Sequence, residues 1–421
     1  MQFLPPSSSK FLTRGNIIAA LDIGSHKVCC LIARVDDAGK PNVIGVGHYL
    51  SQGIKHGVVV DVDAAASAIG HAVHAAEQMA GETITEVIVN VSGSHLQSFL
   101  HKSTLTLSGE VSDAHIQKAL NLSRQELTKH DQLKLIQAIP VEYTLDGQTG
   151  VVDPRGLHGH QLQTTVHLVT ANSSVVKNLA ACVQRKHLEI CGMVAAPYAA
   201  GLAALVDDEL ELGAVVIDMG GGTTNIGVFS GRHLVFADCI PIGGQHITTD
   251  IARGLTTPMA QAERMKTLYG NAIATSSDDR EIIDVPQVGE EEAAESNHVP
   301  RSFLVTIIQP RVEEILELVR ERLEASGQFH QTSRRVVLTG GASQLQGLRD
   351  LAQAMLERQV RHGKPMYVTG LAEAASGPAF AVAAGLLLSP FQASMGGEMN
   401  IRRGASDDWM EAIKSWLEDN L

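Results

Sequence analysis

The chain has 421 residues, enough for two or more domains. Apolar residues make up 44% and charged residues 19%, which is typical of a soluble globular protein. The formal net charge of −13 argues against broad electrostatic binding to nucleic acid, because such binding needs a basic face.

Two segments far apart in the chain share one pattern, in which a β-branched run is followed by an Asp-x-Gly turn and a second strand. The first, IIAALDIGSHKVCCLIARV, spans residues 17–35, and the second, AVVIDMGGGTTNIGVF, spans residues 214–229. Two similar hairpins predict a duplicated architecture.

The region between the hairpins predicts a small inserted α+β domain over residues 95–172. It contains the short strand patterns STLTLS, KLIQAIPVEYTL and QLQTTVHLVT around one helical stretch that starts at Ser112. Residues 173–188 then have helical periodicity. The apolar positions on one face of that helix are Val176, Leu179, Ala180 and Val183.

The C-terminal half begins with an acidic stretch, residues 278–296, which predicts a solvated loop. A long amphipathic helix should follow, with Pro310 in its first turn or at a kink. Its apolar positions are Val312, Ile315, Leu316, Val319 and Leu323. A strand–GG–helix unit, RRVVLTGGASQLQGLRDLAQAML, comes next, and residues 389–406 show no periodicity.

The sequence contains no clear targeting segment and no clear metal-binding motif. Residues 1–16 lack the apolar core of a signal peptide, and the apolar run 380–388 is too short to cross a bilayer. The five cysteines have the spacing of neither a zinc site nor a disulfide framework, which indicates a reducing cytosol. His158 and His160 have no carboxylate or cysteine at ligand spacing, so solvated histidines are the better interpretation.

The glycines of the second hairpin suggest a phosphate-binding turn. Gly220, Gly221 and Gly222 would let several backbone N–H groups face one anion without a Cβ atom in the way. Asp22 and Asp218 end the first strand of each hairpin and could hold a hydrated Mg²⁺ between them. Either turn alone is better explained as an ordinary glycine turn.

The segment after the glycines separates the possible classes of nucleotide site. TTNIGVF alternates as a strand, whereas a Rossmann or Walker loop must open a helix. Bound phosphates would therefore be clamped by two hairpins. Residues 340–343 (GGAS) do open a predicted helix, and their small side chains would let a flat base approach the backbone.

Two Asp-x-Gly hairpins followed by VVLTGGAS resemble the nucleotide-binding fold of actin, Hsp70 and the sugar kinases. Within that superfamily, the chain resembles the FtsA family of bacterial cell-division proteins over nearly its whole length. The inserted domain separates this family from the rest of the superfamily. The matching segments are LDIGSHKV, AIPVEYTLDG, VHLVTAN, VVIDMGGGTTNIGVF, PIGGQHITTDIARGLTTPMAQAERMK, QPRVEEILELV, VLTGGASQLQGL and the terminal amphipathic helix.

The resemblance implies an α/β, actin-like nucleotide-binding fold with two related lobes, an inserted small α+β domain and a C-terminal amphipathic helix. The implied subdomains are 1A at 16–94 (completed by 173–200 and 378–390), 1C at 95–172, 2A at 201–250 (completed by 331–377) and 2B at 251–330. A linker at 391–405 and a membrane-targeting helix at 406–421 would follow.

The resemblance also implies ATP and Mg²⁺ as ligands. The phosphates would meet the two glycine turns, Glu263 and Lys266 would reach ribose and base, and the GGA segment would flank the adenosine. From the residues alone, Glu263 and Lys266 are an exposed ion pair one helical turn apart. The expected cofactor-binding residues are Asp22, Gly24, Ser25, His26, Lys27, Asp218, Gly220, Gly221, Gly222, Thr223, Gly243, Gly244, Glu263, Lys266, Gly340, Gly341 and Ala342.

The function implied is an ATP-binding scaffold that self-assembles and tethers the FtsZ ring to the cytoplasmic face of the cell membrane. The Hsp70 relatives carry an acid before the proline of a connecting helix, where this chain has Ala196 before Pro197, so at most weak ATPase activity is expected. A small-molecule kinase of the same fold and a pilus-type actin-like scaffold are the alternatives.

The resemblance implies protein partners at two places. Arg311, and less securely Arg301, would contact the C-terminal peptide of FtsZ, although both could instead be surface arginines with local acidic partners such as Glu314. Later cell-division proteins would bind the inserted domain.

The chain end forms one apolar stripe on a 3.6-residue helix: Trp409, Met410, Ile413, Trp416, Leu417 and Leu421. This stripe either docks on the protein's own body or lies in a bilayer interface. The preceding linker, the two tryptophans and the resemblance favour the membrane.

Overall fold

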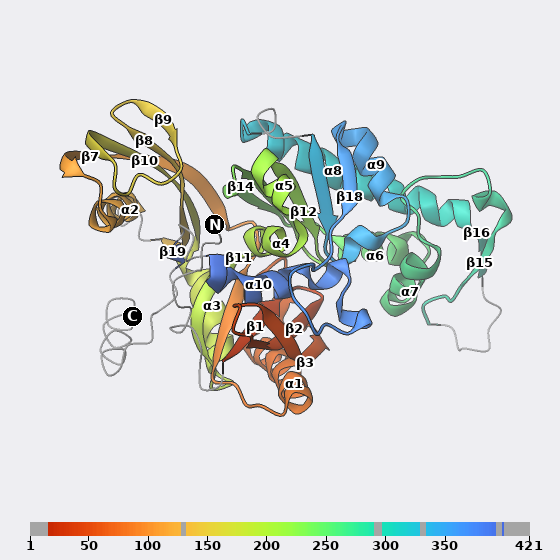
Figure 1. The fold of residues 1–421 in the computed structure, drawn as a ribbon. Coiled ribbons are helices and arrows are strands. Elements are labelled where there is room, and N and C mark those ends of the chain that lie inside the picture. The colour runs from red at the N-terminus through yellow and green to blue at the C-terminus, as the bar shows by residue number, and fades with distance from the viewer. Residues whose placement is uncertain (1–15, 128–131, 290–296, 329–333, 393–397, 400–421) are drawn as a thin grey trace.

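A computed structural model describes residues 16–127, 132–289, 297–328, 334–392 and 398–399 (Figure 1). It has two lobes, each built on a five-stranded sheet, and a third five-stranded sheet that belongs to the inserted domain. The first lobe contains the N-terminal hairpin and the second lobe contains the glycine-rich hairpin.

The sheet of the first lobe is mixed. β1 pairs with β2 antiparallel and with β6 parallel, and the strand order is β11-β6-β1-β2-β3. The β1–β2 hairpin is nearly all buried, because apolar residues face both sides of the sheet. Its strands are β1 (Ile17–Ile23), β2 (Lys27–Val35), β3 (Pro41–Leu50), β6 (Glu86–Val91) and β11 (Glu189–Ala195).

The sheet of the second lobe repeats this topology in the order β14-β13-β12-β17-β18, with β12 antiparallel to β13 and parallel to β17. The same sequence of pairings around each Asp-x-Gly turn confirms the predicted duplication. The strands are β12 (Ala214–Met219), β13 (Thr224–Ser230), β14 (His233–Ile240), β17 (Arg335–Thr339) and β18 (Gln359–His362).

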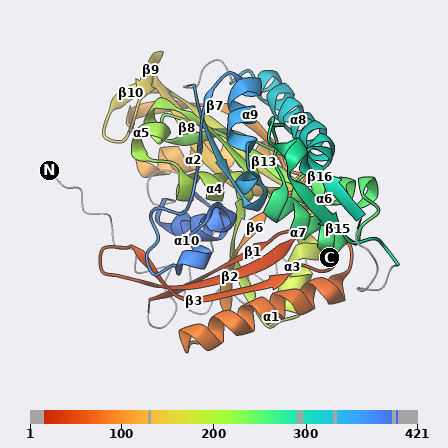
Figure 2. The ribbon, with the colours of Figure 1, turned by 90° about the vertical axis from the view of Figure 1, so that its right-hand side faces the viewer.

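Helices cover both faces of the two sheets. α1 (Val62–Ala80) and α3 (Ser173–Gln184) share a core with one face of the first lobe, and Figure 2 shows α1 lying along β1, β2 and β3. α4 (Ala196–Ala204) and α10 (Ala381–Gln392) pack together between the two sheets and join residues of both lobes into one core. This shared core places the two glycine turns opposite each other.

The inserted domain leaves the first lobe after β6 and lies to the left in Figure 1. The expected strands are all present, and the helix begins at Asp113, one residue after the predicted start. The elements are β7 (Gln97–Glu110), α2 (Asp113–Leu127), β8 (Leu133–Leu145), β9 (Gln148–Val151) and β10 (His158–Asn172), and β19 (Glu398–Met399) pairs with β8.

The outer face of the second lobe carries α6 (Gly244–Gly254), α7 (Met259–Tyr269), α8 (Arg301–Ala325) and α9 (Leu348–Leu356). The five apolar positions predicted for α8 are all buried. Pro310 is the tenth residue of a helix that begins at Arg301, so it does not lie in the first turn, and a kink there stays a prediction. The GG segment differs from the prediction, since it opens a 3₁₀ turn, η2 (Gly341–Gln344), and α9 starts only after Gly347.

The acidic stretch is more ordered than the predicted loop. It contains η1 (Asp278–Arg280) and β15 (Ile282–Val285), which pairs with β16 (Asn297–Pro300), while residues 290–296 lie outside the described residues. Asp278 is fully buried. Its carboxylate accepts a hydrogen bond from the Thr275 N–H and faces Arg301, and these partners compensate the buried charge.

Short elements complete the described chain. They are β4 (Ile54–Lys55), β5 (Val58–Val59), α5 (Asp207–Leu212), η3 (Glu373–Ala375) and η4 (Pro378–Phe380). Among the described residues, no helix is both long and apolar enough to cross a membrane. The predicted terminal stripe, with Trp409 and Trp416, lies outside the described residues, as does nearly all of the predicted linker.

Candidate functional site

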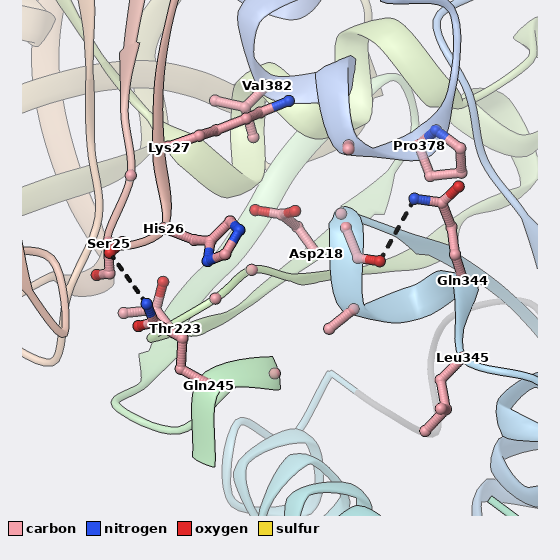
Figure 3. Close-up of a pocket in the computed structure, with 18 of the residues that line it drawn as sticks. Ser25, His26, Lys27, Asp218, Thr223, Gln245, Gln344, Leu345, Pro378 and Val382 are labelled. Carbon is pink, nitrogen blue, oxygen red and sulfur yellow. Dashed lines mark hydrogen bonds between the residues drawn. The ribbon is translucent and has the colours of Figure 1, made fainter. Parts of the chain in front are cut away.

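A cavity of about 460 Å³ lies between the two lobes, where the turns of both hairpins meet (Figure 3). All the predicted cofactor residues except Gly222 and Gly243 line it. Those lining it are Asp22, Gly24, Ser25, His26, Lys27, Asp218, Gly220, Gly221, Thr223, Gly244, Glu263, Lys266, Gly340, Gly341 and Ala342.

Both hairpin turns close in the same way. In the first, the Gly24 N–H donates to the Lys27 carbonyl at 3.0 Å, and in the second the Gly220 N–H donates to the Thr223 carbonyl at 2.8 Å. The next N–H groups of each turn, at 25–26 and 221–222, find no acceptor within the described part of the chain. Unpaired N–H groups on two facing turns form a suitable site for an anion with several oxygens, such as a polyphosphate.

Glycine is required where the two turns meet. A Cβ atom on Gly221 would lie 2.5 Å from the His26 Cβ, and one on Gly222 would lie 2.7 Å from the Ser25 Cβ. Gly243 plays the same part against the Gly220 carbonyl, at 2.6 Å. Gly222 therefore allows the two turns to lie close together, and Gly243 allows the start of α6 to lie against the second turn, although neither lines the cavity.

Two carboxylates stand at the ends of β1 and β12, each held by an asparagine. The Asn90 Nδ2 donates to the Asp22 Oδ1 at 2.8 Å, and the Asn225 Nδ2 donates to the Asp218 Oδ2 at 2.9 Å. Desolvation raises the pKa of Asp22 to about 7 and that of Asp218 to about 6, although Lys27 acts against both shifts. Paired oxygen ligands whose charged forms are disfavoured suit a divalent cation, which would stabilise both carboxylates.

Lys27 brings a positive charge to the same end of the cavity. Its Nζ lies 3.3 Å from the centroid of the Phe380 ring, a cation–π contact with the short turn η4 that precedes α10. Burial lowers the pKa of Lys27, while Asp22 and Asp218 act in the opposite direction. This position lets the ammonium balance anions bound between the turns.

Glu263 and Lys266 also face the cavity, so they are not an isolated surface pair. The Lys266 Nζ lies 2.7 Å from the Glu263 Oε2 and donates to the Thr248 Oγ1 at 2.8 Å and to the Gly244 carbonyl at 3.2 Å. Burial opposes ionisation of Glu263, but hydrogen bonds from Lys266 and Thr248 outweigh it and lower the pKa. The pair is thus preorganised beside the first turn of α6.

The opposite wall is made of backbone and small side chains. Gly340 has φ +84°, and a Cβ atom there would lie 2.4 Å from the Met219 carbonyl oxygen. At Gly341 a Cβ atom would meet only Ala379, at 3.7 Å. The wall at Gly341 and Ala342 is therefore open enough for a flat ring to lie against it.

Several lining residues were not predicted. Asn90 is the one polar side chain in the apolar strand EVIVNV after its first residue, and this interruption could have been noticed in the sequence. Ser92 donates to the Asn225 Oδ1 at 2.8 Å and so links the two lobes beneath the cavity. Gln245, whose Nε2 lies 3.4 Å from the Ser25 carbonyl oxygen, and Gln346 lie inside segments that carry the family resemblance, but neither was expected as a site residue.

Ala196 lines the cavity at the first position of α4, directly before Pro197. The carboxylates among the residues described around the cavity are those of Asp22, Asp218 and Glu263. None of them stands at the start of α4, where the chain has Ala196.

The two predicted partner arginines lie on α8 and differ in exposure. Arg311 is 27% exposed, with its Nε donating to the Asp250 Oδ2 at 2.6 Å and its Nη1 contacting Glu314. Arg301 is 14% exposed and is bonded to Tyr269, Glu281 and Gln346. Glu314 is the local acidic partner named as the alternative for Arg311.

Two further expectations concern metals and cysteines. In the described ranges, no three His, Cys, Asp or Glu side chains are grouped as metal ligands, so His158 and His160 form no such site there. All five cysteines are free thiols, four of them buried.

Family models match two parts of the chain. One described as cell division protein FtsA matches residues 215–385, and one described as the SHS2 domain inserted in FtsA matches residues 93–170. Cell division protein FtsA of Rhizobium meliloti (strain 1021) is 46% identical over 398 residues, which cover 92% of this chain and 89% of that protein. FtsA of Escherichia coli (strain K12) is 32% identical over 416 residues, which cover 96% of this chain and 98% of that protein.

Solved structures share the fold at low identity. A chain of the PilM–PilN type IV pilus biogenesis complex has a TM-score of 0.61 at 18% identity and covers 89% of this chain and 98% of its own. MreB5 of Spiroplasma citri bound to ADP has a TM-score of 0.51 at 14% identity and covers 90% of this chain and 97% of its own. These likenesses confirm an actin-like fold with two related lobes.

Proposed function

The chain belongs to the FtsA family of cell-division proteins, and we propose that it is an ATP-binding, actin-like scaffold that self-assembles and tethers the FtsZ ring to the cytoplasmic face of the cell membrane. The observation that carries the nucleotide part is the cavity between two glycine turns, with a pair of carboxylates at its floor. MreB5, which shares the fold, was solved with ADP bound.

In this proposal the N–H groups of both turns and the Lys27 ammonium hold the phosphates of ATP. Asp22 and Asp218 hold Mg²⁺, through water molecules of its shell, and the metal adds positive charge next to the phosphates. Glu263 and Lys266 meet the ribose, and the Gly340–Ala342 wall supports the base. Hydrolysis is weak, because Ala196 offers no group that could orient a water molecule.

We place the main contact for the FtsZ C-terminal peptide at Arg311. Its guanidinium is held by Asp250 and Glu314, and an acidic peptide group would compete for the same donors. Arg301 has little exposed surface to offer a peptide, so its contribution there is minor. Later cell-division proteins would bind the inserted domain, which extends away from the cavity (Figure 1).

The terminal helix supplies the membrane contact in this proposal. Its acidic side chains outnumber its one lysine, so anionic lipid repels it and a single tail binds weakly through Trp409, Trp416 and the rest of the stripe. Self-assembly with ATP presents many tails to one membrane, which makes the attachment firm.

One three-component experiment tests the tether: co-sedimentation of FtsZ with liposomes in the presence of ATP, Mg²⁺ and this protein. The double variant Trp409→Ala/Trp416→Ala should leave both proteins in the supernatant. Arg311→Glu should still pellet but should leave FtsZ behind. Arg320→Glu, on an exposed part of the same helix, is the matched control and should behave as wild type.

The tether is wrong if wild type and the double tryptophan variant pellet equally. The Arg311 assignment is wrong if Arg311→Glu carries as much FtsZ into the pellet as Arg320→Glu does. Pelleting that does not change with ATP or with protein concentration would contradict the role of self-assembly.

A further inference from the structure

Arg301 stands behind the wall of the cavity that is farthest from the two glycine turns. Its Nε donates to the Tyr269 carbonyl at 2.8 Å, its Nη1 to the Glu281 Oε2 at 2.9 Å and its Nη2 to the Gln346 Oε1 at 2.9 Å. Arg301 thus connects the end of α7, the start of β15 and the loop after η2. The side chain of Asp278, 1% exposed, lies 3.6 Å away and compensates the charge.

The segments that Arg301 connects form this wall. Thr267, Leu268 and Gly270 line the cavity from one side, and Leu345 and Gln346 line it from the other. The two segments are bonded directly, because the Ala272 N–H donates to the Gln346 carbonyl at 2.8 Å. Figure 3 shows Leu345 on the side of the cavity away from Ser25 and Thr223, where the base of a nucleotide would lie.

The contact with Arg301 fixes which end of the Gln346 amide is free. A guanidinium only donates hydrogen bonds, so the group facing it must be the amide oxygen. The amide nitrogen has no acceptor among the residues that the structure describes. Gln346, which lines the cavity, therefore has an N–H₂ donor rather than an acceptor at the free end of its amide.

We propose that Arg301 is a positioning residue for nucleotide selection: by holding Gln346 with its N–H₂ group free, it makes the base-side wall favour adenine over guanine. N1 of adenine is an unprotonated acceptor, whereas N1 of guanine carries a hydrogen that a donor repels. This inference rests on the proposed nucleotide-binding function. It gives Arg301 a role inside the protein besides its minor part in the proposed peptide contact.

The test is the ratio of the affinities for ATP and GTP, measured by calorimetry with Mg²⁺ on the full chain. Wild type should favour ATP. Gln346→Leu removes the donor and Arg301→Lys loses the fork that orients it, so each should lower the ATP:GTP ratio by about three- to tenfold. Gln346→Glu keeps the size but turns the donor into an acceptor, and should lower the ratio further. Arg320→Lys is the matched control and should leave it unchanged.

A purely structural role would lower the thermal stability of Arg301→Lys without moving the ratio. If wild type binds ATP and the three variants keep its ATP:GTP ratio, the inference is overturned and the proposed function stands. If wild type binds neither nucleotide, the proposed function itself fails.

Discussion

The imidazole of His167 is fully buried in β10, and neither ring nitrogen has a hydrogen-bond partner among the described residues. Burial lowers the pKa of His167 to about 3, because the charged ring would lose its water. The unfolded chain has an ordinary histidine pKa near 6.5. Below that pH the unfolded state binds more protons than the folded state, so the free energy of unfolding falls as the pH falls toward 3.

Replacing His167 should therefore make the protein less sensitive to acid. Between pH 7 and pH 5 the wild type should lose about 2 kcal/mol more unfolding free energy than His167→Leu. Urea unfolding at the two pH values measures this difference. His74→Gln, at an exposed position of α1, is the control, and an equal pH dependence of wild type and His167→Leu would contradict the burial argument.

The residues of the repeated Asp-x-Gly pattern were predicted, whereas several residues that line the cavity beside them were not. The glycine turns, Asp22 and Asp218 follow from the repeated Asp-x-Gly pattern. Gln346 and Ser92 reach the cavity only because distant segments fold together, and periodicity carries no information about such meetings. For the same reason Arg301 looked like a surface residue, although its partners lie on three other segments.

At the scale of elements, the hairpins and α8 were predictable because burial on one face or on both leaves a period in the sequence. The start of α8 at Arg301 was not, because a proline such as Pro310 is compatible both with the first turn of a helix and with a kink inside it. The antiparallel pair β15–β16 was hidden because the acidic residues around it suggest a loop, whereas Asp278, in the turn before β15, is buried against Arg301, which is distant in sequence.

The contact between α4 and α10 joins the lobes and depends on glycine. A Cβ atom on Gly385 would lie 1.7 Å from the Ala199 carbonyl oxygen, so no side chain fits without moving the helices apart. Gly385→Ala should lower the free energy of unfolding by about 1–3 kcal/mol, although alanine is the better helix former.

Gly70→Ala in α1 is the matched control, because the nearest atoms there belong to the flexible side chain of Lys186, at 3.1 Å or more. It should be neutral or slightly stabilising. Chemical unfolding of both variants gives the comparison. Equal stability of Gly385→Ala and wild type would mean that the helices can separate freely.

At the scale of the whole molecule, the cavity exists because two copies of one sheet topology face each other across α4 and α10. Each lobe contributes one carboxylate and one glycine turn, so neither lobe forms the site alone. The turns touch through Gly221 and Gly222, and any atom added there separates the lobes.

The central claim is that ATP with Mg²⁺ binds between these turns, and calorimetric titration of wild type and Gly221→Val tests it most directly. Valine at 221 would push against His26 and separate the turns, so the affinity should fall by about tenfold or more. Asp218→Asn, which keeps the size of the side chain, should bind ATP with little dependence on Mg²⁺. Circular dichroism should show both variants folded. If Gly221→Val keeps the wild-type affinity for ATP, the nucleotide does not bind between the two hairpins.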